Sequence, residues 1–349
     1  MCINNYTAGF DNLYIFSELA MDIASFRNEA KMDKLIDLND YPVNKYLKAL
    51  LKDKTTKKNI IFATSAYSLQ GHPIRETEQI TEEILSNFIQ CEIQPRVLKN
   101  KEQQQERTKA RAEVFTPAWV CNKMNNHCDE EWFGRKGVFN TEKEQNWIIN
   151  FQTVIFDEKD GWKDYVDSKR LEITCGEAPY IVSRYDAATG EMIEIKRRIG
   201  ILDRKLRVVN ENTDNESEWF KWTLRAYQSV YGYEFQGDNL LIARINLLVT
   251  FVDYMRDRWN RVPTDTELKK IVNVIVWNFW QMDGITSTVP YGKPREEYQQ
   301  FSLFDFVVTG QSEKQSEDEQ NEVYCRIYDW RSDRSLTYKS MKEGREDEV

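Results

Sequence analysis

The sequence lacks a long apolar run. No stretch of about 20 consecutive apolar residues, the length that a helix needs to cross a bilayer, occurs anywhere in the 349 residues. Charged residues also interrupt every apolar segment near the N-terminus, so no secretion signal is indicated. We therefore expect a cytoplasmic protein that has no membrane among its partners.

Cysteine and histidine are scarce, with six and two residues respectively. The cysteines have no paired spacing, which favours free thiols in a reducing compartment. Cys121, His127 and Cys128 come closest to a zinc-ligand pattern, but no second Cys/His pair at ligand spacing completes it. We therefore expect no metal site.

Positive charge is also in short supply. The 57 acidic residues outnumber the 48 lysines and arginines, and the formal net charge is −9. Because phosphate neutralisation needs clustered lysines and arginines, any contact with nucleic acid has to come from a local patch. One candidate is the polar, helix-like stretch 96–111, in which Arg107, Lys109 and Arg111 form either a phosphate-contacting arm or a solvated helix face.

Apolar and aromatic residues, in contrast, are plentiful. The hydrophobic fraction is 41%, with 10 Trp, 17 Tyr and 17 Phe, which indicates a folded protein with a sizeable core. Between residues 112 and 284, short apolar segments alternate with longer helical patterns, as in a parallel sheet with crossover helices. We expect an α/β fold with four regions. Residues 1–98 form a mainly helical region that includes one strand at 59–64, and residues 99–310 form a ligand-binding domain. An acidic linker (311–321) and a C-terminal strand and tail (322–349) follow.

Residues 171–180 combine a short strand with a turn of small residues. The strand contains Glu172, and the turn contains Gly176 and Ala178 ahead of a helix-forming stretch. Small residues let a ligand approach the backbone closely, because a larger side chain would fill that space. An ordinary tight turn between a strand and a helix has the same pattern, so both interpretations stay open.

A second strand pattern, residues 230–239, contains Glu234 ahead of a helix expected over 240–248. In nucleoside-binding Rossmann folds, an acid at the end of the second strand accepts hydrogen bonds from the ribose hydroxyls. Alternatively, Glu234 stabilises the N-terminus of the following helix through the helix dipole.

A third apolar segment, residues 271–284, is either a helix or a strand and runs into Asp283. An acid at this position could accept a hydrogen bond from the amino group of an adenine. Phe279 and Trp280 either cover such a ring or belong to the core.

The segment 112–120, Ala-Glu-Val-Phe-Thr-Pro-Ala-Trp-Val, resembles the element that precedes the first motif in adenine-specific DNA methyltransferases of the gamma motif order. Residues 171–180, Glu234 and Asp283 then resemble the first, second and third motifs of that family, in the family's order. The stretch 94–284 is also similar to the short proteins labelled restriction endonuclease subunit M. Ala178 departs from the pattern, because it stands where the family usually has a second glycine.

The resemblance implies S-adenosyl-L-methionine as cofactor, bound in a Rossmann-like class I methyltransferase core with an incomplete or modified sheet. It implies DNA as a partner, together with a restriction or specificity subunit. The residues that it assigns to the cofactor lie in the loop over the methionine part and in the three motifs: Phe115, Thr116 and Pro117; Glu172, Thr174, Cys175, Gly176, Ala178 and Tyr180; Glu234 and Phe235; and Asp283.

The family's catalytic tetrapeptide, Asn/Asp-Pro-Pro-Tyr, does not occur in the chain. It holds the extruded adenine, so its loss should slow methyl transfer by orders of magnitude. Tyr291, next to a proline, is the candidate for the stacking role, and residues 304–311 resemble the strand that normally leads into the tetrapeptide. Three functions stay open: an adenine methyltransferase with a degenerate catalytic loop, a silent cofactor-binding module that acts as a partner or sensor in a defence complex, and a methyltransferase for RNA or protein.

Overall fold

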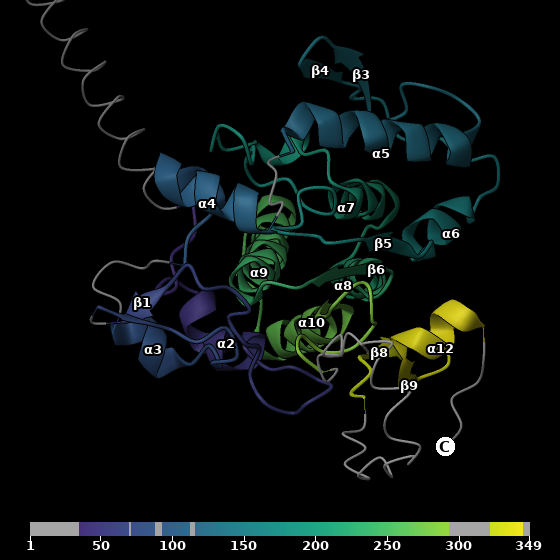
Figure 1. The fold of residues 1–349 in the computed structure, drawn as a ribbon. Coiled ribbons are helices and arrows are strands. Elements are labelled where there is room, and N and C mark those ends of the chain that lie inside the picture. The colour runs from purple at the N-terminus through teal and green to yellow at the C-terminus, as the bar shows by residue number, and fades with distance from the viewer. Residues whose placement is uncertain (1–34, 70, 88–92, 112–115, 293–321, 345–349) are drawn as a thin grey trace, which may run out of the picture.

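The computed structural model describes residues 35–69, 71–87, 93–111, 116–292 and 322–344 (Figure 1). Within these ranges the chain combines helices with four small sheets, so the expected mixed α/β class is confirmed. Phe115, the predicted strand at 304–311 and the predicted linker at 311–321 lie outside the described residues.

A three-stranded parallel sheet lies at the centre of the fold, in the order β5 (Arg170–Glu172), β6 (Val230–Glu234) and β7 (Phe279–Gln281). In its register, Leu171 pairs with Tyr231, and Tyr233 pairs with Trp280. Two helices make each crossover: α7 (Ile201–Asn212) and α8 (Glu216–Gln228), then α9 (Gly237–Trp259) and α10 (Asp265–Asn278). The predicted parallel sheet with crossover helices is therefore present.

Element boundaries differ from the sequence predictions at several places. The helix predicted after the turn that follows β5 is wrong, because left-handed residues such as Ala178 interrupt a helical backbone; the next helical element is the 3-10 turn η2 (Ile195–Arg197). The segment 271–284 is both helix and strand, because α10 continues to Asn278 and only three residues of β7 follow.

The strand predicted at 59–64 is wrong. Two isolated bridges form there, and both main-chain groups of Ile61 bond the side-chain amide of Gln281, at 2.9 and 2.8 Å, instead of a neighbouring strand.

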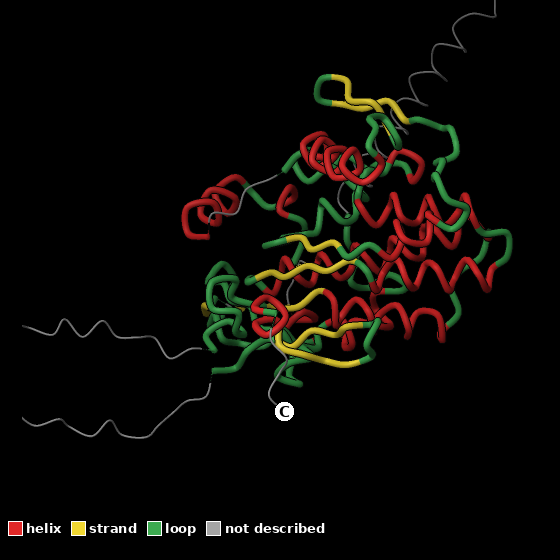
Figure 2. Tube along the Cα trace, turned by 90° about the vertical axis from the view of Figure 1, so that its right-hand side faces the viewer, coloured by secondary structure: helices red, strands yellow, loops and turns green. Residues whose placement is uncertain are grey.

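The two faces of the parallel sheet are covered differently. Val230 and Phe279 belong to the large core cluster that the helices form, whereas Tyr231, Tyr233 and Trp280 belong to a smaller cluster with the C-terminal unit. That unit consists of the hairpin β8–β9 and a short helix, and it lies beside the three strands in Figure 2: β8 (Arg326–Asp329), β9 (Arg334–Thr337) and α12 (Tyr338–Glu343). The division follows from the two-residue period of a strand, which points successive side chains to opposite faces.

Helix α9 runs through the core and is buried along most of its length (Figure 1). Arg244, 0% exposed, lies on this helix and donates hydrogen bonds to main-chain carbonyls at Phe279 and Lys52. The guanidinium thereby joins β7 to the N-terminal region. Among the described helices, none has both the length and the apolar character that a bilayer crossing requires.

The N-terminal region packs on the same core as the rest of the chain. Its elements are α2 (Val43–Leu50), β1 (Ser68–Leu69), β2 (His72–Pro73), α3 (Glu82–Asn87), the 3-10 turn η1 (Arg96–Leu98) and α4 (Lys101–Arg111). Leu50 and Phe62 share one apolar cluster with Leu240 and Ile275. The core is therefore continuous across residue 98, where the sequence suggests a boundary.

A third group of elements covers the side of α7 (Figure 1). It comprises α5 (Ala118–Phe133), the hairpin β3 (Asn140–Lys143) and β4 (Asn146–Ile149), and α6 (Gly161–Asp167). Arg204 of α7 is paired with Asp129 of α5, and both side chains are almost fully buried. Helix α5 is thereby held in place directly after the 112–117 segment.

Candidate functional site

The carboxyl ends of the three parallel strands lie at one edge of the sheet, where ligands bind in folds of this kind. β5 ends at Glu172 and β6 at Glu234, while Asp283 follows the end of β7 by two residues. The two glutamates are 9% and 6% exposed. The structure therefore places the three predicted acids at the same edge.

The turn after β5 has an unusual backbone. Thr174, Gly176 and Ala178 all have left-handed conformations, with φ of +48°, +53° and +64°. A Cβ added at Gly176 would meet no atom within 4 Å, so open space lies beside this glycine. The left-handed φ at Ala178 is a conformation that glycine adopts more readily than alanine, so the alanine here is strained.

Glu234 ties this turn to the neighbouring strand. Its Oε2 accepts a hydrogen bond from the Gly176 amide at 2.9 Å, and its Oε1 accepts one from the Gln236 amide at 3.1 Å. The Cys175 amide also donates to the Tyr233 carbonyl, at 2.8 Å. The acid that sequence reasoning assigned to a ribose thus also shapes the turn, and the ribose contact stays a prediction.

Glu172 is a buried carboxyl group with incomplete hydrogen bonding. Its Oε1 accepts from the Tyr180 amide at 3.4 Å, whereas Oε2 is buried and has no hydrogen-bond partner within the described part of the chain. Burial, and to a smaller extent the nearby Glu234, raises the pKa of Glu172 to about 8. A cationic group placed beside it would stabilise the ionised form.

Helix α5, which follows the 112–117 segment, lies against the stretch after the same turn. Asn125 Nδ2 of α5 donates to the Tyr180 carbonyl at 3.0 Å, just after the turn. Pro117 is the N-cap of α5, and the Ala118 amide donates to Asp186 at 2.8 Å. Two elements whose contacting residues are 55 or more positions apart in the sequence are therefore in direct contact.

Asp283 and Tyr291 both have partners within the described part of the chain. The Asp283 carboxylate accepts hydrogen bonds from the amides of Ile285, at 2.9 Å, and Thr286, at 3.3 Å, so it closes its own turn. The Tyr291 ring packs edge-on against Phe235 with 5.7 Å between centroids, and its hydroxyl donates to Glu76. The predicted contacts of these residues with adenine and with a target base stay predictions.

Arg107 is not on the surface, where a phosphate contact would need it. It is 3% exposed, and its guanidinium pairs with Asp238 at 2.8 Å. Lys99 and the Tyr67 hydroxyl reach the same carboxylate, at 3.2 and 2.6 Å. The reason is that a fully buried charge such as Asp238 requires partners of opposite charge.

The Asp238 cluster, made of Asp238, Tyr67, Lys99 and Arg107, was missed by sequence reasoning. Burial alone would raise the pKa of Asp238, but the two cations beside it hold the pKa well below its usual range. The only sequence signal is an acid in the first turn of a helix, which is common on protein surfaces. Of the other two residues of the predicted arm, Lys109 is exposed, and the side chain of Arg111 lies outside the described part.

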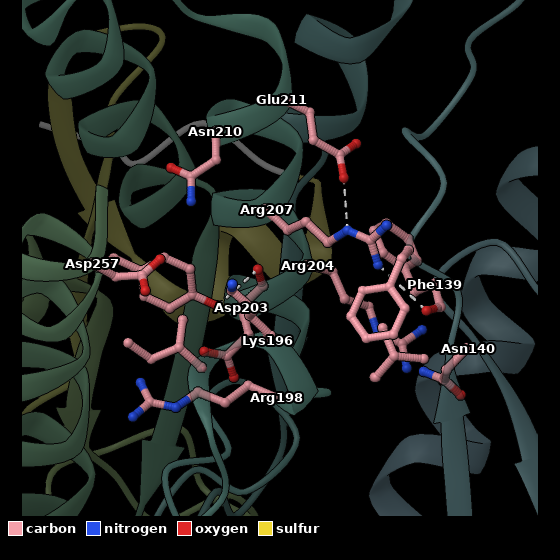
Figure 3. A pocket seen from close by; sticks show the side chains of 14 residues that line it. Phe139, Asn140, Lys196, Arg198, Asp203, Arg204, Arg207, Asn210, Glu211 and Asp257 are labelled. Atoms are coloured by element: carbon pink, nitrogen blue, oxygen red, sulfur yellow. Dashed lines mark hydrogen bonds and ion pairs between the residues drawn. The ribbon is translucent and has the colours of Figure 1, made fainter. Parts of the chain in front are cut away.

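A cavity of about 240 Å³ lies elsewhere, beside α7 and the β3–β4 hairpin (Figure 3). None of the predicted residues lines it. Two of its arginines are already engaged: Arg207 Nε donates to Glu211 at 2.7 Å, and Arg204 pairs with Asp129. We therefore place the candidate site at the sheet edge, where the strand ends converge.

Among the described residues, no group of three or more His, Cys, Asp or Glu side chains is placed to hold a metal ion. Cys121 is fully buried, whereas the side chain of His127 is 67% exposed and lies next to Glu131.

No protein-family model, no curated protein and no solved structure matches the chain.

Proposed function

We propose that the chain binds S-adenosyl-L-methionine at the carboxyl edge of β5–β6–β7, within a Rossmann-like class I methyltransferase core, and that it is a DNA adenine N6-methyltransferase-like protein of a restriction-modification or phage-related system. One observation carries the proposal. Helix α5, which follows the Thr116 loop, is hydrogen-bonded to Tyr180 after the left-handed turn 174–178, and the turn is hydrogen-bonded to the β6 acid Glu234, all at a single edge of the sheet.

The residues present fit the cofactor in two respects. The open space beside Gly176 allows a ligand to approach the backbone of the turn. The buried Oε2 of Glu172 lacks a hydrogen-bond partner in the described part, and the cofactor carries a sulfonium and an ammonium group that would stabilise a carboxylate. In this proposal, Thr116 and the turn hold the methionine part, Glu234 holds the ribose, and Asp283 lies near the adenine.

When bound, the cofactor would supply the methyl group. The chain's own contribution would be to orient the ligand through Glu234 and the turn, and to stack a target base on Tyr291. Because the Asn/Asp-Pro-Pro-Tyr tetrapeptide is absent, no pair of acceptors holds the adenine amino group, and slow transfer is expected.

A second candidate function is a silent cofactor-binding module that acts as a partner or sensor in a defence complex. The observation that favours it is the environment of Tyr291, whose ring packs on Phe235 and whose hydroxyl bonds Glu76. A side chain with both ends engaged would have to leave these contacts before it could stack on a base.

Calorimetry with S-adenosylmethionine and its demethylated product tests cofactor binding. Glu234→Ala should weaken binding by about 1–3 kcal/mol, because the ribose hydroxyls lose their acceptor. The exposed Glu191→Ala is the matched control and should bind as the wild type does. An analogue that lacks the ribose 2′-hydroxyl separates a ribose contact from a loosened turn: it should bind more weakly to the wild type but not to Glu234→Ala.

If removing the 2′-hydroxyl weakens binding equally in the wild type and in Glu234→Ala, the ribose assignment is refuted. If the intact cofactor gives no binding heat with the wild type, the proposal itself is refuted. Transfer is then measured with a radiolabelled methyl group on DNA, RNA and protein substrates. A labelled methyl group on DNA adenine supports the adenine methyltransferase. Tight cofactor binding without label in any substrate supports the silent module.

A further inference from the structure

Residues 53–58, which we call the lysine loop, present three lysines on a well-ordered turn. Asp53 is 5% exposed, and its Oδ2 accepts hydrogen bonds from the amide and the hydroxyl of Thr56, at 2.7 and 2.6 Å. Main-chain bonds between Asp53 and Lys58 and between Lys57 and Asp53 close the loop. Lys57 has a left-handed backbone, with φ of +63°. The loop therefore has a fixed shape that exposes Lys57 and Lys58 and leaves Lys54 half-buried.

Two of these lysines lie beside the same indole ring. The Nζ atoms of Lys54 and Lys57 are 5.3 and 5.6 Å from the centroid of Trp277, near the end of α10. Lys54 Nζ also donates to Asn273 Oδ1 of α10, at 2.9 Å. Because an aromatic face attracts cations, the ring holds two like charges close together.

The lysine loop carries three lysines and a single acid, Asp53. Within the described part of the chain, none of its three lysines forms an ion pair, and the carboxylate of Asp53 is engaged with Thr56. Burial, followed by the charges of Lys57 and Arg244, lowers the pKa of Lys54. Three like charges beside a single carboxylate repel one another, so an anion bound here would relieve the repulsion.

We propose that the lysine loop and Trp277 form a contact for the phosphate backbone of DNA. Lysine ammonium groups bind phosphates as point charges, and closely spaced contacts release counterions from a densely charged polymer. A protein whose net charge is −9 can use only a local patch of this kind. A less densely charged acidic protein segment would gain less from the same three contacts.

The lysine loop contacts the last turn of α10, which leads into β7. Trp277 precedes β7, so it marks the amino end of that strand, whereas the turn 174–178 lies at the carboxyl edge. A contact here would hold DNA that flanks a target base. The inference rests on the proposed function for its choice of DNA as partner, but its test needs no cofactor.

Fluorescence anisotropy with a labelled duplex of mixed sequence, measured over a series of salt concentrations, tests the proposal. Three lost phosphate contacts should reduce the magnitude of the slope of log Kobs against log salt by about 2.7 in a K54Q/K57Q/K58Q variant. The matched control is K45Q/K163Q/K269Q, which has the same net charge but removes lysines that are paired with acids. Its slope should equal that of the wild type.

A K54R/K57R/K58R variant keeps the charges and should keep the slope, which separates loss of charge from loss of fold. Equal slopes for the glutamine variant and its control would overturn the proposal. Binding of polyglutamate by the wild type as tightly as of DNA would also overturn it, in favour of an acidic protein partner. Cofactor calorimetry on the glutamine variant should be unchanged, so a failure of DNA binding is distinguishable from a failure of cofactor binding.

Discussion

Replacing Glu172 by glutamine should change how the stability of this protein depends on pH. The carboxyl group is 9% exposed, and burial, together with Glu234, raises its pKa from 4.5 to about 8. The unfolded chain has the ordinary pKa, so between pH 4.5 and about 8 the folded state keeps a proton that the unfolded state has released. Raising the pH through this window therefore destabilises the fold, and the loss is complete above it.

The size of the effect follows from the shift. One pKa unit corresponds to about 1.4 kcal/mol, so a rise from 4.5 to about 8 lowers the free energy of unfolding by at most ~5 kcal/mol. Glutamine has no charge at any pH and keeps an acceptor for the Tyr180 amide. Its buried NH2 group lacks an acceptor, which costs about 1–3 kcal/mol. Glu172→Gln should therefore be less stable than the wild type by about that amount at pH 5 and more stable by about 2–4 kcal/mol above pH 8.

Urea unfolding followed by tryptophan fluorescence from pH 5 to pH 9 measures both curves. The expected result is that the curves cross between these limits. Glu191→Gln, at an exposed position, is the control and should follow the wild type throughout. Parallel curves for Glu172→Gln and the wild type would refute the argument, because the slope would then come from other groups.

Three further changes test other parts of the structure. Gly237→Ala places a Cβ 2.0 Å from the Ile61 carbonyl oxygen, so urea unfolding should show a loss of about 2 kcal/mol or more, and a change below half of that would contradict the close approach. Asp238→Asn leaves two buried cations without their counter-charge, and we expect a loss of about 3–5 kcal/mol in the same assay, whereas a neutral outcome would mean that the cluster is hydrated. Tyr291→Ala should leave the Kd for cofactor nearly unchanged but, if the chain methylates DNA, should reduce turnover strongly; equal turnover would remove Tyr291 from the site.

Local sequence patterns predicted the parts of the site that depend on neighbouring residues. Strand β6 ends at Glu234 as its pattern indicates, and Glu172 lies at the end of a short strand ahead of a turn that requires left-handed backbone. Successive side chains of β6 point to opposite faces of the sheet, as the two-residue period of a strand requires: Val230 belongs to the large core cluster, and Tyr231 and Tyr233 belong to the smaller one. These features could be predicted because strand period and turn chemistry depend on a few adjacent residues.

Contacts over long sequence distances were not predictable in this way. Arg107 has the pattern of a solvated helix residue, yet it is buried because Asp238, more than 130 residues further along, needs a counter-charge. The lysine loop acquires its indole partner only because α10 packs beside it. The sequence by itself predicted that β5 and β6 are strands with an acid at the end and that a turn follows β5. Only the tertiary structure decided which charges are buried and which stay exposed, since burial depends on what distant segments bring into contact.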